Sequence, residues 1–453
     1  MQNVEHIKQT RDRLNKVGPG FCAMKWLHQT LYLHTGDNHS CYHPRPHHIP
    51  LVEIEAGPSA LHNKKFKKEQ RKQMLEGERP SECYYCWNIE DLEGDHISDR
   101  MIHSSSNFAV DEIENLANLP WDAPINPRYL EVSFGNGCNY RCGYCSPQAS
   151  TLWMDEIKKH GNYDLTYNQY GIDFLENGTY YGPKDDNPYV EAFWKWWPDL
   201  RKDLHTLRIT GGEPLMNPGA MQFFNLLEKE PAPQLEVSIN SNLGVSFNKI
   251  DKLIERINSL LKNNKIKSFS LFTSIEGWGA QAEYMRTGMQ CSHWERNFVK
   301  AIEEGSQVNI MCTFNVLCVA TFQNFLEKVI EWRKKYGKQA LSFDTPYLKE
   351  PPHWMINILP QDFLNEHMDK HLQFIKDNME WFTDVEYEKM LRVRDYAYQN
   401  PVDANKIKQG RRDFYSFFKE NDKRTVGLNM LEVFPMYEEF YNQCKEVYEN
   451  YDK

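Results

Sequence analysis

The sequence lacks the features that would place the protein in a membrane, on nucleic acid or in an oxidising compartment. No apolar run approaches the roughly 18 residues that span a bilayer, and the first residues show no apolar signal-peptide core. Lysine and arginine total 53 against 63 aspartates and glutamates, a net charge of −10, which argues against a general nucleic-acid binder. We therefore expect a cytoplasmic protein with no membrane partner, whose 11 cysteines stay reduced.

The sequence also lacks internal repeats and low-complexity tracts. Its 453 residues, 40% of them hydrophobic, are enough for two or three domains or for one large unit with appendages. In a reducing compartment, closely spaced cysteines indicate metal or cluster ligands rather than disulfides.

The middle of the chain alternates strand-like and helix-like segments. Amphipathic stretches such as FNKIDKLIERINSLLKNN carry apolar residues at helical spacing, and Asn217 and Pro218 give another such stretch a cap and a first-turn proline. This alternation predicts an α/β fold with a parallel sheet. The strand candidates are 129–134, 204–210, 235–240, 268–275, 308–316 and 340–345.

Three cysteines follow the first of these strands in the run SFGNGCNYRCGYC. Cys138, Cys142 and Cys145 have a C-x3-C-x2-C spacing. Three thiolates cannot complete a four-ligand structural metal site, so a zinc knuckle would have to borrow a ligand from elsewhere. They do suit an iron–sulfur cluster in which one iron keeps an open position.

Two further motifs follow later strands. Thr210-Gly211-Gly212-Glu213-Pro214 places glycines at a strand end, where they allow close backbone approach to a ligand, beside a carboxylate that can receive an amine. The run SIEGWGAQAEYMRTG then contains Ser274, Glu276 and Arg286. The forked guanidinium of Arg286 suits a carboxylate.

Taken together, these motifs resemble those of the radical S-adenosylmethionine (SAM) superfamily. The resemblance implies a partial (β/α)6 TIM-like barrel and a [4Fe–4S] cluster on the three cysteines, with SAM on the fourth iron. The reduced cluster of this family cleaves SAM to a 5′-deoxyadenosyl radical, which takes hydrogen from a substrate. The implied SAM contacts are Tyr144 at the adenine, Gly211, Gly212 and Glu213 at the amino group, Arg286 at the carboxylate, and Asn240, Ser274, Glu276 and Asn315 near the nucleoside. Glu276 departs from the usual aspartate, and Asn242 is a second candidate beside Asn240.

A second set of four cysteines lies near the N-terminus. Cys22, Cys41, Cys83 and Cys86 could hold zinc or a second cluster. Their pattern is similar to the twitch or SPASM-like modules of radical SAM enzymes, which implies an auxiliary [4Fe–4S] cluster, with zinc as the alternative. Four nearby histidines could each replace a ligand, although we expect surface or supporting roles for them: His28, His43, His47 and His48.

These patterns predict three parts: a cysteine-rich auxiliary module over 1–122, a radical SAM core over 123–349 and a helical extension over 350–453. The resemblance implies SAM, a peptide or protein substrate and a reductase such as flavodoxin or ferredoxin as partners; a small molecule such as a nucleotide or sugar is the alternative substrate. A non-catalytic, zinc-stabilised binding protein on a degenerate barrel is the alternative of another class. The basic run over 64–72 is expected to be a solvated helix face.

Overall fold

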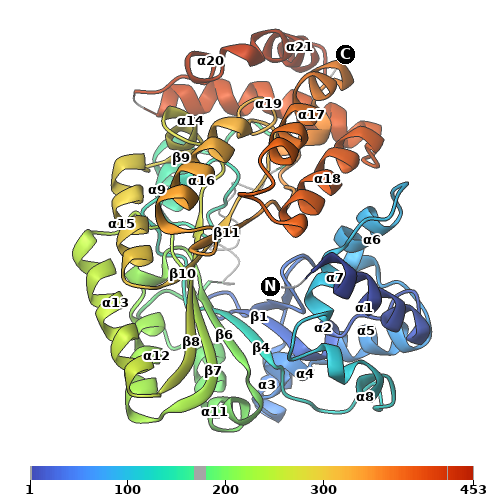
Figure 1. The fold of residues 1–453 in the computed structure, drawn as a ribbon, viewed down its shortest axis with the longest axis vertical. Helices are drawn as coiled ribbons and strands as arrows, with labels where there is room; N and C mark the ends of the chain where they lie inside the picture. Colours follow the sequence, from blue (N-terminus) through green and yellow to red (C-terminus); the bar gives the residue numbers. More distant parts are fainter. Residues whose placement is uncertain (1–2, 168–179, 426, 452–453) are drawn as a thin grey trace. The chain divides into compact units, whose positions relative to one another are not determined.

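The computed structural model describes residues 3–167, 180–425 and 427–451 (Figure 1). Contacts divide these residues into two compact units. Unit 1 contains the described residues of 1–136, 175–240 and 255–270, and unit 2 those of 137–174, 241–254 and 271–453. In the described ranges no helix is both long and apolar enough to cross a membrane. The three-part division expected from the sequence stays a prediction.

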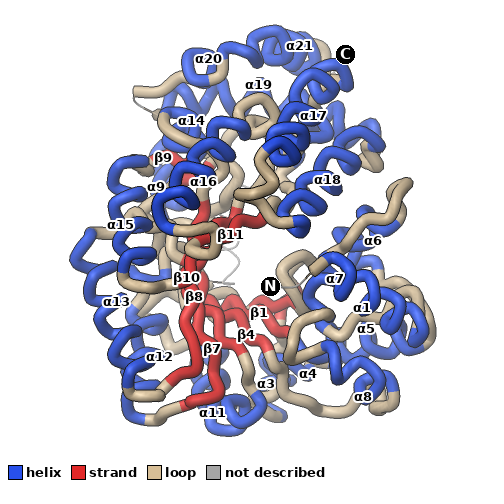
Figure 2. Tube along the Cα trace, in the orientation of Figure 1, coloured by secondary structure: helices blue, strands red, loops and turns tan. Residues whose placement is uncertain are grey.

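Unit 1 is built on a mixed sheet in which the strand from the N-terminal module joins those of the predicted core. β1 pairs in parallel with β4, β4 with β6, and β6 with β7, while β2 and β3 continue antiparallel from β1. Figure 2 shows β1 beside β4. Because β4 and β6 are parallel and Ser133 is level with Thr210, the segments that follow both strands leave the same edge of the sheet. The strands are β1 His28–Tyr32, β2 Asp37–His39, β3 His47–His48, β4 Tyr129–Ser133, β6 Thr206–Thr210 and β7 Ala232–Asn240.

Two long helices of unit 1, α11 and α12, begin at asparagine caps. Asn217 caps α12 by accepting from the amides of Gly219 and Ala220, and Asn187 does the same for α11. Trp196 and Trp197 of α11 are buried core residues. The helices are α1 Val4–Val17, α2 Met24–Leu27, α3 Leu51–Ala56, α4 Ala60–Asn63, α5 Lys65–Leu75, α6 Tyr84–Glu90, α7 Asp99–Ser104, α8 Ile113–Ala117, α11 Pro188–Asp203 and α12 Pro218–Lys229, with short 3-10 turns η1 Ser81–Cys83, η2 Val110–Glu112 and η3 Pro214–Met216.

The basic run on α5 is not the solvated face that its composition suggested. Lys67 and Arg71 are buried. The Lys67 ammonium donates to the carbonyl of His28 at 2.7 Å, and the Arg71 guanidinium donates to the carbonyl of Lys25 at 3.2 Å. Buried cations need such acceptors to offset the loss of water, so this helix face holds unit 1 together.

Unit 2 combines two strand pairs with most of the C-terminal helices. β10 and β11 are parallel, and β5 and β9 form a short antiparallel pair. Helices α19 and α21, drawn in orange to red in Figure 1, lie against each other, with the rings of Phe414 and Phe440 5.0 Å apart. The elements are β5 Arg141–Cys142, β9 Arg286–Thr287, β10 Gln307–Met311, β11 Leu341–Asp344, α9 Thr151–His160, α14 Ala280–Met285, α15 Cys291–Glu303, α16 Phe322–Tyr336, α17 Gln361–Asp377, α18 Asp384–Gln399, α19 Ala404–Arg424, α20 Met430–Val433 and α21 Glu438–Glu449, with η4 Pro352–Trp354, η5 Ile356–Ile358 and η6 Pro435–Tyr437.

All six strand candidates form strands. The largest difference is at the fifth, where β10 ends at Met311 and only an isolated bridge from Phe314 to Tyr347 continues it. β8 (Ile266–Ser274) and α13 (Phe247–Lys262) each have residues in both units. The described strands form no closed barrel, and the partial (β/α)6 barrel stays a prediction.

Candidate functional site

The loop that carries Cys138, Cys142 and Cys145 is held by a strand pairing and by hydrogen bonds within unit 2. β5 pairs with β9 so that Cys142 lies directly opposite Arg286. The indole of Trp153 donates to the carbonyl of Cys142 at 2.9 Å, and the amide of Cys138 donates to the hydroxyl of Thr151 at 3.2 Å. These contacts hold the backbone of the cysteine loop in place.

The C-terminal extension also holds this loop. The guanidinium of Arg141, the residue before Cys142, donates to the side chain of Asn421 on α19 at 2.9 Å and to the hydroxyl of Thr425 at 2.6 Å. It also donates to the hydroxyl of Tyr163 at 3.1 Å. Arg141 is buried, so these acceptors replace its water shell. The extension is thus part of the support of the cysteine loop.

A buried ion pair lies beside the second cysteine. Arg286 donates to Glu276 from Nε at 2.7 Å and from Nη2 at 3.2 Å, and its Nη1 is 3.5 Å from the sulfur of Cys142. The hydroxyl of Tyr144 donates to Glu276 and accepts from Arg286 at 2.5 Å. Burial acts to lower the pKa of Arg286, but Glu276, Tyr144 and Cys142 together outweigh it and hold that pKa well above its ordinary value. A fixed positive charge therefore stands next to a potential cluster ligand.

The thiols of this loop are not gathered closely enough for one tetrahedral ion. On one tetrahedral zinc, thiolates lie about 3.8 Å apart, given Zn–S bonds of about 2.3 Å. Among the described residues, no three cysteine sulfurs lie within 4.8 Å of one another. A four-iron cluster places each thiolate on a different iron and so tolerates the wider spacing. Burial raises the pKa of Cys145 to about 12, so ligation in this loop must release protons.

Gly143 occupies a position where no side chain fits. A Cβ there would overlap the indole ring of Trp354, which is 1% exposed, and the amide of Gly143 is held by the carbonyl of Met285 at 2.9 Å. We expect Gly143→Ala to lower the free energy of unfolding by about 1–3 kcal/mol and to reduce iron loading. Denaturant unfolding and iron analysis measure both effects. The control is Gly137→Ala, whose Cβ meets no described atom within 4 Å; equal losses in the two variants would contradict the prediction.

The Gly-Gly-Glu-Pro motif lies in unit 1, directly after β6. Gly211 has φ +144°, a conformation that side chains disfavour, and a Cβ there would lie 2.8 Å from the carbonyl oxygen of Gly135. The amide of Gly212 donates to that same carbonyl at 3.2 Å. Glu213 is 1% exposed and its carboxylate accepts from the amide of Leu215 at 3.1 Å. A buried carboxylate is thus placed at the carboxyl end of β6, as the motif predicted.

The residues predicted to lie near the SAM nucleoside have different hydrogen-bond partners in the structure. Asn240 accepts from Arg208 at 2.7 Å within unit 1. Asn242 in unit 2 donates towards the sulfur of Cys138 at 3.6 Å and to the side chain of Asn139 at 2.9 Å. Asn315 is fully buried and accepts from the amide of Leu317 at 3.0 Å, while Ser274 ends β8. Of the two asparagines at the end of β7, Asn242 is therefore the one at the cysteine loop.

The four N-terminal cysteines come together in unit 1. Cys22, Cys41, Cys83 and Cys86 line one small cavity, although they lie far apart in the sequence. Burial raises the pKa of Cys83 to about 11, even though the nearby ammonium of Lys25 acts to lower it. These are the four cysteines that the sequence named as candidate ligands, and their role as ligands stays a prediction.

A buried charge pair next to these cysteines was not predicted. Lys25 is 2% exposed and forms an ion pair with Glu82, which also contacts His47 at 2.6 Å. Burial acts to raise the pKa of Glu82, but the charges and hydrogen bonds of Lys25 and His47 together outweigh it and lower the pKa to about 2. The position of Glu82 next to Cys83 was the only sequence signal for this pair. Of the four histidines named from the sequence, His43 alone lines the cysteine cavity.

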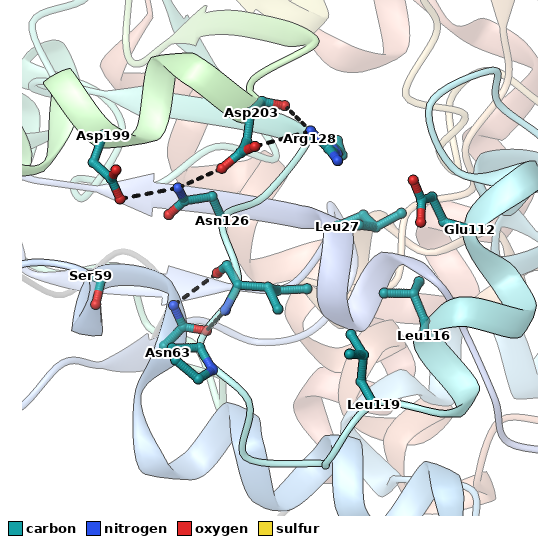
Figure 3. A pocket seen from close by; sticks show the side chains of 12 residues that line it. Leu27, Ser59, Asn63, Glu112, Leu116, Leu119, Asn126, Arg128, Asp199 and Asp203 are labelled. Carbon is teal, nitrogen blue, oxygen red and sulfur yellow. Dashed lines mark hydrogen bonds and ion pairs between the residues drawn. The ribbon is translucent and has the colours of Figure 1, made fainter.

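A separate cavity of about 460 Å³ in unit 1 lies at the amino-terminal ends of β1 and β4, opposite to the strand ends that lead into the motifs (Figure 3). Leu27 and Arg128, which precede β1 and β4, line it. Its polar groups bond to one another: Asn126 donates to Asp199 at 3.3 Å and to Asp203 at 2.9 Å. In parallel α/β folds the chemistry lies at the carboxyl ends of the strands, so we assign this cavity no part in the site.

Comparison with known proteins gives the class of this site. Residues 132–271 match the model of the Radical SAM superfamily. The chain therefore contains a radical SAM domain. No curated protein matches the chain.

One solved structure is similar over about half of the chain. It is described as "Native anSMEcpe with bound AdoMet and Kp18Cys peptide", with 16% identity over 55% of this chain and 60% of that chain and a TM-score of 0.32. The chain thus covers less than two thirds of that protein, and a likeness of this size carries no argument about function.

Proposed function

We propose that the protein is a radical SAM enzyme whose core [4Fe–4S] cluster is bound by Cys138, Cys142 and Cys145 in a partial (β/α)6 barrel. The observation that carries the proposal is the pairing of Cys142 opposite the buried Arg286, in a loop that begins inside the matched domain. When bound, the cluster supplies the electron that cleaves SAM to methionine and a 5′-deoxyadenosyl radical. The residues of the chain orient SAM and exclude water.

The groups around the cysteine loop suit the charges of SAM. Arg286 would bind the SAM carboxylate, because a forked guanidinium already fixed by Glu276 loses little freedom on binding. In unit 1, the resemblance to the radical SAM superfamily assigns the SAM amino group to Glu213, a buried carboxylate. The ring of Tyr144, whose hydroxyl is held by Glu276 and Arg286, would lie against the adenine. Asn242 is a better candidate than Asn240 for a nucleoside contact, because Asn240 is engaged by Arg208.

An auxiliary [4Fe–4S] cluster on Cys22, Cys41, Cys83 and Cys86 is the second part of the proposal. The gathering of four thiols around one cavity supports it, with a single zinc ion as the alternative. The resemblance to twitch and SPASM-like modules supports a peptide or protein substrate. A cytoplasmic reductase such as flavodoxin or ferredoxin would supply the electron.

The test is anaerobic reconstitution with iron and sulfide, followed by dithionite and SAM. We expect 5′-deoxyadenosine, detected by mass spectrometry, and about eight irons per chain, as two four-iron clusters require. Absence of 5′-deoxyadenosine from a chain with full iron loading would contradict the proposed activity. Bound zinc without iron would leave the zinc-stabilised binding protein as the better account.

Replacing Cys83 and Cys86 together with serine separates the two centres. We expect the double variant to lose about half of its iron and sulfide, because only the auxiliary cluster depends on these thiols. SAM cleavage without a substrate should persist, since the core cysteines are untouched. Iron and sulfide analysis of the variant beside the unaltered chain is the measurement, and unchanged iron would mean that no cluster occupies the N-terminal site.

A further inference from the structure

Three side chains beside the N-terminal cysteines form a second set of candidate ligands. His43, Asp99 and His103 each offer one nitrogen or carboxylate oxygen, and these atoms all lie within 4.8 Å of one another. Asp99 and His103 are four residues apart on α7 (Figure 1), so their side chains share a face of that helix. His43 reaches them from the segment between β2 and β3. All three also line the cavity of the four cysteines.

Neighbouring aromatic rings hold the two histidines in place. The imidazole of His43 stacks on the ring of Tyr85, with centroids 3.6 Å apart and planes 3° apart, and its Nε2 contacts the carboxylate of Asp99. The imidazole of His103 meets the ring of Tyr42 edge-on at 5.1 Å. Asp99 is itself buried. Ligands fixed by packing in this way lose little freedom when an ion binds.

The cavity therefore contains two ligand sets that differ in chemistry and spacing. The sulfurs are too far apart for three of them to share one ion, whereas the nitrogen and oxygen atoms are close enough to do so. A salt bridge between His43 and Asp99 alone would account for the buried carboxylate, but it would not account for the convergence of His103 on the same point. Two imidazoles and one carboxylate are a ligand set that zinc and ferrous iron accept.

We propose that His43, Asp99 and His103 bind one divalent ion, Zn²⁺ or Fe²⁺, beside the four-cysteine centre. With two neutral imidazoles and one carboxylate the bound ion keeps a net positive charge, which is stabilised next to thiolates. Three protein ligands leave a coordination position open for water or a substrate group. The proposal does not depend on the activity of the core cluster.

Metal and sulfide counts test this site without any assay of activity. A [4Fe–4S] cluster contains equal numbers of iron and sulfide, so an extra ion appears as metal in excess of sulfide at any cluster occupancy. We expect the reconstituted full-length chain to hold about one ion more than its sulfide count, with elemental analysis showing whether the ion is iron or zinc. In Asp99→Asn and in His103→Gln the excess should disappear while sulfide is unchanged.

Two further variants complete the experiment. His48→Ala is the matched control, because His48 belongs to the same module but its side chain is 51% exposed and pairs with Asp37; its excess ion should remain. Cys83→Ser with Cys86→Ser should lose sulfide but keep the excess ion. Cobalt(II) added to the chain before cluster assembly should give visible bands that weaken in His103→Gln. Three results would each overturn the proposal. The first is an unaltered chain that holds no metal in excess of sulfide, and the second is excess metal that remains in Asp99→Asn and His103→Gln. The third result is that those variants lose sulfide together with the ion.

Discussion

Cys142→Ala is expected to bring 5′-deoxyadenosine formation down to background. Cys142 is one of only three thiols in its loop, and it alone lies opposite Arg286 on β9. Two remaining thiolates cannot hold a four-iron cluster in place, so the loss should exceed the roughly 10–100-fold that follows removal of an outer-shell partner. Mass spectrometry of the nucleoside product, normalised to folded protein, is the measurement. Iron and sulfide should fall by about half, because the N-terminal centre remains.

The control for this variant is a cysteine that is buried but lies outside the motif. Cys444 on α21 is fully buried in unit 2, so Cys444→Ala removes a sulfur from the interior without touching the loop. It should cost stability through the cavity it leaves and keep SAM cleavage per folded molecule. If Cys142→Ala retained product formation, the assignment of the core cluster to this loop would be wrong.

The sequence was sufficient to predict the local features of the fold and the core motif. Strand and helix periodicity located the six core strands, because apolar spacing reports directly on local structure. The C-x3-C-x2-C run and the later Glu276 and Arg286 were recognisable for the same reason: each lies within a short segment. The structure then adds what spacing could not show, namely that Glu276 binds Arg286 and that Arg286 reaches Cys142.

Contacts between segments that are distant in the sequence could not be predicted. β1 lies in parallel with β4, roughly a hundred residues later, so part of the predicted separate module belongs to the sheet. Lys67 and Arg71 looked like surface charges because composition does not reveal carbonyl acceptors contributed by other elements. The convergence of His43 with Asp99 and His103 is also tertiary. The sequence favoured Asn240 and Asn242 equally as SAM contacts. The fold distinguishes them, because Asn240 accepts a hydrogen bond from Arg208 whereas Asn242 lies at the cysteine loop.

Breaking the ion pair between Glu276 and Arg286 is expected to have the other large effect. Both side chains are almost completely buried, at 0% and 5% exposure. Glu276→Gln leaves an uncompensated guanidinium inside the protein, and Arg286→Met leaves a buried carboxylate, so each should lower the free energy of unfolding by about 3–5 kcal/mol. Each should also abolish SAM cleavage if Arg286 orients SAM. Denaturant unfolding of the cluster-free chain and product formation by the reconstituted chain measure the two effects separately.

The double variant separates stability from function. Replacing both members with neutral residues removes the unpaired charge, so Glu276→Gln with Arg286→Met should recover most of the lost stability while SAM cleavage stays at background. The pair Arg333 and Glu386, also in unit 2, is the matched control: its atoms are 2.6 Å apart and its side chains 1% and 4% exposed. Glu386→Gln should destabilise the chain to a similar extent and leave SAM cleavage per folded molecule intact. Activity in the double variant at the level of the unaltered chain would mean that Arg286 supports the fold and does not orient SAM.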